Sequence, residues 1–273
     1  MMRLVQSEWE RLWAKKVTWL CFAMIPLMLW GAVKYSMEHN RSITKTAADY
    51  TYANTFPYMG LAEMIVSIFN LILLVTMALM ISHEYYSGQM RIVLQRTYTY
   101  RQILFGKMVV MLIMMALFFL VYFICSYVIG YVCFEFNPNV FLFYYEQPTN
   151  SGTEVFLYTL KYYIIAYIIT VCVSSIFMAI TVLSKSTTSA IAFGMGFILL
   201  SLIVPEVVQN FVSDNQILYV QSSSVIYLQA RGIALALTEN VDFISLCSFV
   251  LAIYMVISNL ITFFILRKKD HFV

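Results

Sequence analysis

Charge is the scarcest property of this sequence. Only 11% of its 273 residues are Asp, Glu, Lys or Arg, whereas 62% are hydrophobic. Soluble globular proteins have about 25% charged and about 45–50% apolar residues, because polar side chains must cover their outside. The composition therefore excludes a soluble protein and predicts a chain that is solvated by the lipid bilayer.

Glycine, proline and cysteine are also few. Nine Gly and five Pro exclude a collagen-like or linker-rich chain, and 21 Phe and 20 Tyr exclude intrinsic disorder. The five cysteines are odd in number and lie mostly within apolar runs, as at Cys21, Cys125 and Cys172. This pattern is typical of small hydrophobic side chains and not of a disulfide framework.

Motifs for nucleotide binding and for hydrolysis are missing. The Gly106-Lys107 pair lacks the earlier glycine and the following Ser or Thr of a phosphate-binding loop. His83-Glu84 begins like a zinc-protease helix, but Ser87 stands where the second histidine is needed, and the three histidines are far apart. We therefore expect a chain that is not an enzyme and that binds no cofactor, metal or nucleic acid by itself.

Six apolar segments are long enough to cross a membrane. A helix needs about 20 apolar residues to cross a ~30 Å hydrocarbon core, and continuous apolar runs indicate helices, not barrel strands. The predicted spans are Val17 to Tyr35, Tyr58 to Ser82, Lys107 to Phe134, Val155 to Leu183, Thr188 to Val204 and Phe243 to Leu266. The predicted fold class is an all-α integral membrane protein whose six transmembrane helices form one domain over residues 17–273.

The distribution of charge predicts the orientation of these spans. Lys and Arg are retained on the cytoplasmic side of a membrane. With both termini cytoplasmic, 12 of the 17 cations lie inside, whereas only 4 of the 14 acidic residues do. We therefore predict a multi-pass protein of the cytoplasmic membrane with both termini inside.

The segment before the first span, residues 1–16, has the pattern of an interfacial helix. Its apolar residues at helical spacing are Leu4, Val5, Trp9, Leu12 and Trp13, with charged residues between them. Two interpretations stay open. The helix is a membrane-lying anchor, or it is an elbow that joins the first span to a cytoplasmic partner.

Two features are predicted near the outer face. Residues 205–242 read as a re-entrant or interfacial segment of short helices, and residues 217–237 as a seventh span are the alternative. Glu63 lies about five residues inside the second span, where a carboxylate is costly. It either lines a substrate path or reaches water at the outer interface.

The connection between the second and third spans, residues 83–107, is the most structured loop of the sequence. Apolar residues form one helical stripe in it, while Arg91 and Arg96 project elsewhere and Gly88 interrupts the helix. One interpretation is a short helix at the inner membrane surface that presents a face to a cytoplasmic protein. The other is a basic loop that contacts anionic lipid headgroups.

This loop resembles the coupling segment of permease subunits of the ABC type-2 exporter family. In that family a glutamate follows the second span, a glycine comes next, and a basic stretch leads through an Arg and a Gly-Lys pair into the third span. Glu84, Gly88, Arg101 and Gly106-Lys107 match these features. The chain length and the high Ile, Phe and Tyr content are similar to permeases of antimicrobial-peptide immunity and bacitracin resistance.

The resemblance implies a non-catalytic permease subunit that exports an amphipathic, peptide or lipid-like substrate. A separate cytoplasmic ATPase, in two copies, would hold ATP and Mg and drive the transport. The residues implied in ATPase coupling are Glu84, Gly88, Arg91, Arg96, Arg101, Gly106 and Lys107. The competing hypotheses are an intramembrane lipid-modifying enzyme and a membrane scaffold or sensor that does not transport.

A half-transporter also needs a second permease half, identical or paralogous. The fifth span contains two small-xxx-small repeats, which allow helices to approach closely. These repeats are Ala190 with Gly194 and Ala192 with Gly196. They are predicted either to pack within the subunit or to form the dimer contact, and membrane lipids are the remaining expected partners.

Overall fold

The computed structural model of the chain consists almost entirely of helices. It describes residues 2–45, 47–82, 84, 99–143, 148–238 and 241–269. Within these residues, Val140 and Thr149 form an isolated antiparallel bridge outside any strand. Six helical segments are long and apolar enough to cross a membrane, which confirms the all-helical, six-span prediction.

Several spans consist of more than one helical element. The first span contains α2 (Lys16–Ala23) and α3 (Ile25–Ser42), and the second contains α4 (Phe56–Met64), the π-helical turn η1 (Ile65–Phe69) and α5 (Asn70–Met80). The third to sixth spans lie in α8 (Tyr100–Cys133), α9 (Gly152–Leu183), α10 (Thr187–Val208) and α14 (Val241–Lys269). Between α10 and α14 lie η2 (Gln209–Phe211), α11 (Asp214–Ser222), α12 (Val225–Tyr227), the π-helical turn η3 (Leu228–Gly232) and α13 (Ile233–Ala236).

Local sequence signals explain where the helices begin. Pro26 and Pro57 lie in the first turn of α3 and of α4, where the missing N–H of proline is not needed. Thr99 and Gln102 form a capping box at the start of α8, and α10 begins in the same way at Ser186. The two capped helices thus start where their side chains satisfy free backbone N–H groups.

The core of the bundle is built around α9. This helix contacts α4, α5, α8, α10 and α14. It is also the most deeply buried of the six spans, whereas α10 and α14 are the least buried. Phe69 in the second span packs its ring edge-to-face against Phe118, Phe119 and Tyr122 of α8. The second, third and fourth spans therefore form the packed centre of the molecule.

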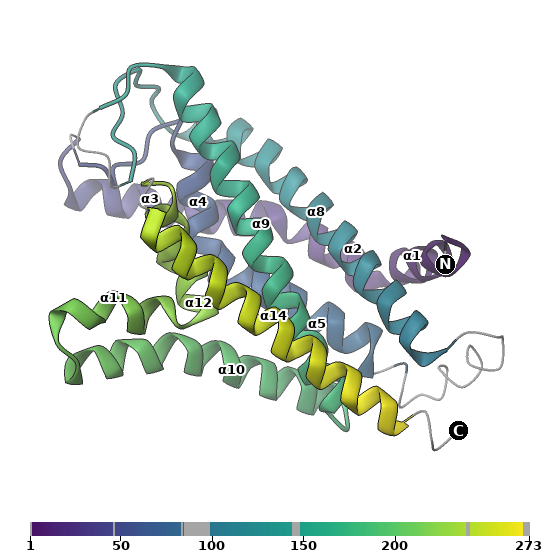
Figure 1. Cartoon of the computed structure of the whole chain (residues 1–273). Helices are drawn as coiled ribbons and strands as arrows, with labels where there is room; N and C mark the ends of the chain where they lie inside the picture. The colour runs from purple at the N-terminus through teal and green to yellow at the C-terminus, as the bar shows by residue number, and fades with distance from the viewer. Residues whose placement is uncertain are drawn as a thin grey trace.

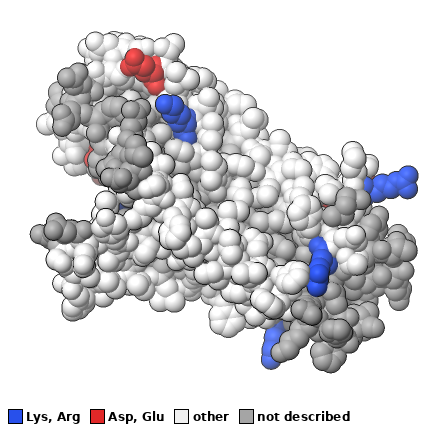
Figure 2. Space-filling view, in the orientation of Figure 1, with Lys and Arg blue, Asp and Glu red and all other residues white. Residues whose placement is uncertain are grey.

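The two ends of the bundle differ in what they carry. Helix α1 (Met2–Ala14) packs against the beginning of α8, and α14 ends at the same end of the molecule (Figure 1). The loops after α3 and α8 lie at the opposite end. We call these the α1 end and the loop end. On the face seen in Figure 2, charged side chains are few and lie toward the two ends, as in a surface whose middle faces lipid.

Several helix boundaries differ from the sequence prediction. Helix α8 begins at Tyr100 and not at Lys107, so the last residues of the predicted loop are the first turns of a helix. Helix α10 continues through Pro205 to Val208, whereas the predicted fifth span ends at Val204. Proline leaves the Ser201 carbonyl without its helical N–H donor, and the Ser224 hydroxyl donates a hydrogen bond to it at 2.5 Å. A side chain from α12's N-terminus thus compensates for the lost bond.

Candidate functional site

A buried group of charged side chains lies at the α1 end. The Lys107 ammonium group on α8 contacts Glu8 Oε2 on α1 and Glu84 Oε2 after α5, each at 2.6 Å. The three side chains are only 1%, 2% and 3% exposed. Because an unpaired buried charge is very costly, these contacts fix α1 to the start of α8 and to the end of the second span.

Two partly exposed cations complete this group. Arg11 Nη1 donates to Glu8 Oε1 at 3.1 Å, and Arg11 Nη2 lies 3.4 Å from Glu84 Oε2. Lys15 Nζ donates to Glu84 Oε1 at 2.8 Å and to the Leu79 carbonyl oxygen at 3.2 Å. We call the following five residues the ion-pair cluster: Glu8, Arg11, Lys15, Glu84 and Lys107. Three cations and two carboxylates give the cluster a formal charge of +1.

The sequence of α1 explains how Glu8 reaches the cluster. Leu4, Glu8 and Leu12 are the buried residues of α1, and their spacing of four residues places them on one face of the helix. On α8, Gly106 precedes Lys107, and a Cβ atom at that position would lie 3.4 Å from the Leu4 side chain. Gly106 and Leu4 therefore face each other, and α1 packs against the start of α8 beside the Lys107 ammonium group.

The electrostatics of the cluster keep Glu84 ionised. Burial by itself would raise the pKa of this carboxyl group, but the charges and hydrogen bonds of Lys107 and Lys15 outweigh it and lower the pKa below its ordinary value. The ionised form is therefore the one that the folded protein stabilises. The cluster is therefore an electrostatic joint between three chain segments.

Of the other predicted coupling residues, the structure describes Gly106 and Arg101. Arg101, one and a half turns before Lys107 on α8, packs its guanidinium group over the Phe263 ring of α14, 4.4 Å from the ring centroid. This contact joins the third span to the end of the sixth. Gly88, Arg91 and Arg96 lie outside the residues that the structure describes.

Sequence reasoning found two members of the cluster and missed three. Glu84 and Lys107 were predicted as coupling residues, and the structure brings them together. Glu8, Arg11 and Lys15 were taken only as polar residues of an interfacial helix. The signal for Glu8 was present, because this carboxylate stands midway between two apolar residues at helical spacing. A charged residue on the buried face of a helix indicates a partner elsewhere in the fold.

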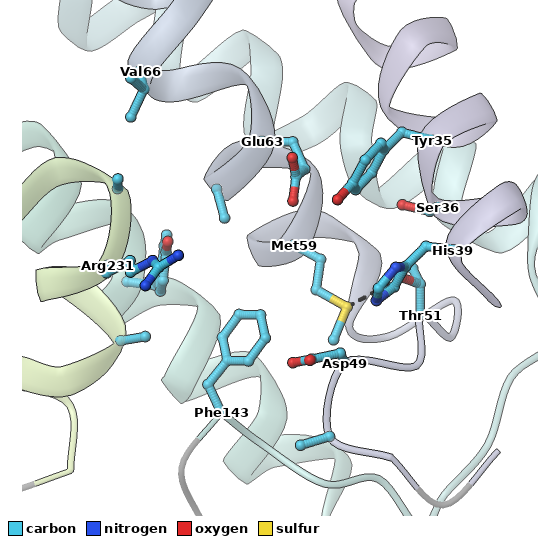
Figure 3. Close-up of a pocket in the computed structure, with 15 residues that line it drawn as sticks. Tyr35, Ser36, His39, Asp49, Thr51, Met59, Glu63, Val66, Phe143 and Arg231 are labelled. Atoms are coloured by element: carbon cyan, nitrogen blue, oxygen red, sulfur yellow. Dashed lines mark hydrogen bonds between the residues drawn. The ribbon is translucent and has the colours of Figure 1, made fainter. Parts of the chain in front are cut away.

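A cavity of about 750 Å³ lies at the loop end (Figure 3). It is bounded by α3, α4, the loop between them, the loop after α8, and the elements η3 and α13. Its polar and aromatic lining includes Tyr35, His39, Asp49, Glu63, Phe143 and Arg231. Glu63 thus lines a cavity that can bind a molecule with charged groups.

A layer of buried polar side chains lies inside the bundle next to this cavity, on the side toward the α1 end. Val66 lines the cavity, and Asn70 lies one helical turn further toward the α1 end. The Asn70 amide donates to Gln229 Oε1 at 2.7 Å, and the Gln229 amide donates to Thr170 Oγ1 at 3.3 Å. All three side chains are buried. We call them the polar layer, and they join the second span to η3 and α9.

Both π-helical turns lie beside the polar layer. Val66 belongs to η1, and Gln229 belongs to η3, and the two turns contact each other. A π-helical turn inserts a residue into the regular hydrogen-bond ladder, and such turns are frequent at functional sites. Their position beside the cavity makes this region a second candidate site.

The two small-residue repeats of α10 point in different directions. Ala190 and Gly194 are buried, and a Cβ atom on Gly194 would lie 2.3 Å from the Leu74 Cδ1 atom of the second span. Ala192 is exposed, and a Cβ atom on Gly196 would meet nothing within 4 Å. The first repeat therefore packs within the subunit, and the second faces away from it.

The described part of the chain has free cysteines and no arrangement of side chains for a metal ion. All five cysteines are free, and Cys21, Cys172 and Cys247 are buried. Among the described residues, no group of three His, Cys, Asp or Glu side chains is arranged to hold a metal ion.

Six apolar helices with a buried joint at one end and a polar cavity at the other define a multi-pass helical membrane protein. Residues 19–272 match the family described as "Protein of unknown function (DUF2705)". The match covers most of the chain, so the protein belongs to this family. It includes Glu63, Glu84 and Lys107, while Glu8 lies before it. A comparison with curated proteins gave no match.

Proposed function

We propose that this protein is the permease subunit of an ABC-type exporter in the cytoplasmic membrane. It moves an amphipathic, peptide or lipid-like substrate with energy from a separate cytoplasmic ATPase, which holds ATP and Mg. Two ATPase copies and a second permease half, identical or paralogous, complete the transporter. The α1 end faces the cytoplasm, because the positive-inside distribution of Lys and Arg favours that orientation.

The ion-pair cluster is the observation that carries this proposal. A coupling segment must pass a movement of the ATPase on to the spans. Glu84 precedes residues 85–98 and Lys107 follows them, and the two side chains are joined at 2.6 Å. Glu8 adds α1 to the same joint. A force on residues 85–98 or on α1 would therefore reach the second and third spans directly.

The mechanism requires different contacts in two states. Closure of the ATPase moves the permease only if the permease contacts the open and the closed ATPase differently, since a ligand shifts an equilibrium by its differential affinity alone. In this proposal α1 is an elbow at the inner interface, and the cluster makes α1, α5 and α8 move together. The cavity beside Glu63 would then be the outward end of the substrate path.

Recovery of the intact complex tests the proposal. The tagged full-length chain is extracted from its native membranes in mild detergent, and each protein that co-purifies is identified by mass spectrometry. We expect a protein with the Walker motifs of an ATPase. We also expect Glu84→Gln to reduce its recovery or its substrate-stimulated ATPase activity at least tenfold.

The control variant is Glu135→Gln, which removes a carboxylate from an exposed ion pair at the loop end. It should leave ATPase recovery unchanged. Absence of an ATPase from the complex after chemical cross-linking in intact cells would refute the proposal. So would substrate turnover by the purified chain alone in vesicles, which would favour an enzyme.

A further inference from the structure

The cavity at the loop end has opposite charges on facing walls. Glu63 from α4 and Asp49 from the loop before it lie on one side, close to Tyr35 (Figure 3). Arg231 from η3 lies on the other side, and Phe143 lies between the two walls. A molecule in the cavity would therefore meet carboxylates on one side and a guanidinium group on the other.

These charged groups are available to a ligand. Within the described residues, Glu63, Asp49 and Arg231 form no ion pair, and each is exposed. The Arg231 guanidinium group packs over the Tyr227 ring and donates to its hydroxyl group at 3.3 Å, which leaves other N–H groups unused. Glu63 lies seven residues after the start of the second span, about 10 Å into it. An ionised group at such a depth normally has a partner or a function.

The lining changes from polar to apolar with depth. Asp49 and Thr51 belong to the loop before the second span, whereas Val66 lies ten residues into that span, about 15 Å from its start. Ala62, Val66 and Ala234 supply the apolar part of the wall. Because a bilayer core is ~30 Å thick, the cavity reaches from the polar boundary to about the middle of the membrane. This gradient suits an amphiphile.

We propose that the cavity binds an amphiphile whose polar head carries a primary ammonium group together with a phosphate or carboxylate group. Glu63 and Asp49 accept hydrogen bonds from the ammonium group, and Arg231 donates to the anionic group as a planar fork. The apolar part of the molecule lies along Val66. A volume of about 750 Å³ holds a lipid headgroup or a dipeptide, but not a folded peptide.

This inference deepens the proposed function, because it names the chemistry of the substrate. It rests on the proposed function only in treating the bound molecule as a transported substrate. Binding itself needs no ATPase. The test therefore uses the purified full-length chain without any partner, so a failure to bind and a failure to find an ATPase are separate results.

Native mass spectrometry with defined phospholipids measures the binding. Phosphatidylethanolamine has the ammonium and phosphate groups, phosphatidylglycerol has only the phosphate, and phosphatidylcholine has a methylated amine that cannot donate. We expect the chain to bind phosphatidylethanolamine at least tenfold more tightly than the other two. The inference would be overturned if the wild-type chain bound the three lipids equally and if the dipeptide Leu-Leu, which also carries an ammonium group and a carboxylate, did not compete with them.

A pair of variants tests which wall of the cavity binds the ammonium group and which binds the phosphate group. Glu63→Gln should remove the preference for phosphatidylethanolamine, whereas Arg231→Gln should weaken binding of all three phospholipids about equally. The matched controls are Glu206→Gln on α10 and Lys161→Gln on α9, two exposed residues that do not line the cavity. Neither should change binding. If Glu63→Gln does not fold, Asp49→Asn in the loop tests the same wall.

A second arm of the experiment distinguishes the two sources of such a head group. The dipeptide Leu-Leu carries an ammonium group, a carboxylate and apolar side chains, but no acyl chains. Its competition with phosphatidylethanolamine, lost in Glu63→Gln, would indicate a peptide source. Binding of phosphatidylethanolamine that Leu-Leu does not reduce would indicate a lipid source. An unchanged lipid preference in both Glu63→Gln and Asp49→Asn would refute the proposed site.

Discussion

Replacing Lys107 by Met tests whether the ion-pair cluster holds the α1 end together. Methionine keeps an unbranched apolar side chain of similar length, so the substitution removes mainly the ammonium group. Lys107 is almost completely buried and makes two contacts of 2.6 Å to carboxylates on different segments. The substitution therefore breaks the links of α8 to Glu8 and to Glu84.

The contacts that remain set the size of the effect. Breaking a buried ion pair by removing one partner costs about 3–5 kcal/mol. In Lys107→Met, Glu84 keeps Lys15 at 2.8 Å, and Glu8 keeps Arg11 at 3.1 Å, so neither carboxylate is left alone. We therefore expect a loss at the lower end of that range, about 3 kcal/mol.

Unfolding of the purified protein in detergent measures this loss. The matched control is Lys45→Met, which removes the ammonium group of the exposed Lys45–Glu135 pair at 3.7 Å. Exposed pairs contribute about 0–1 kcal/mol, so the control should unfold at nearly the wild-type denaturant concentration. Limited proteolysis at Arg3 and Arg11 should also become faster in Lys107→Met, because α1 loses its main attachment.

Two results would refute this reasoning. The first is a Lys107→Met protein that unfolds no earlier than Lys45→Met. The second is strict additivity in a double-mutant cycle of Lys107→Met with Glu8→Gln, since residues in direct contact should show a coupling of about 0.5–3 kcal/mol.

Three further predictions concern stability. Because the folded protein lowers the pKa of Glu84, its contribution to stability is present above its ordinary pKa of 4.5 and is lost as the pH falls through the lower folded value. Glu84→Gln should therefore flatten the profile of stability against pH below pH 4.5. Gly194→Ala brings a Cβ atom to 2.3 Å from Leu74 and should lower the free energy of unfolding by about 1–3 kcal/mol, whereas Gly196→Ala should not. Leu74→Ala should reduce the difference between these two variants. Gln229→Leu removes two buried hydrogen bonds, although Asn70 still donates to the Val66 carbonyl group and Thr170 to the Ala166 carbonyl group. At about 0.5–1.5 kcal/mol for each lost bond, it should cost about 1–3 kcal/mol in chemical unfolding. A wild-type midpoint would show that the polar layer is not stabilising.

The number and type of the spans could be predicted because the membrane limits the choices. A continuous apolar run of about 20 residues has one stable form in lipid, the helix, and each of the six predicted runs lies in such a helix. The boundaries were harder, since they depend on tertiary contacts. The fifth span was predicted to end at Val204, but α10 continues past Pro205, because Ser224 from another segment satisfies the carbonyl group that proline leaves free.

Members of the ion-pair cluster could be predicted only where they belong to one continuous segment of the sequence. Glu84 and Lys107 stand at the two ends of one loop, so a local motif includes both. Glu8 is 99 residues from Lys107, and no local pattern pairs them. Glu63 was visible as a carboxylate in a span, but Arg231 on the opposite wall of its cavity was seen only as a polar interruption of an outer segment. The residues next to a side chain in the sequence do not indicate which distant residue it contacts in the fold.

The second span connects the two sites of the molecule, and this connection limits how they can communicate. Its α5 end is held by the ion-pair cluster, through the Leu79 carbonyl group and Glu84, while its α4 end carries Glu63 in the cavity. Between them lies η1, where the helical ladder is irregular, followed by the polar layer at Asn70. A rigid helix would transmit a rotation at one end to the other, whereas a π-helical turn can absorb it. Coupling between the sites therefore requires that η1 and the polar layer have two alternative arrangements, one for each state of the α1 end.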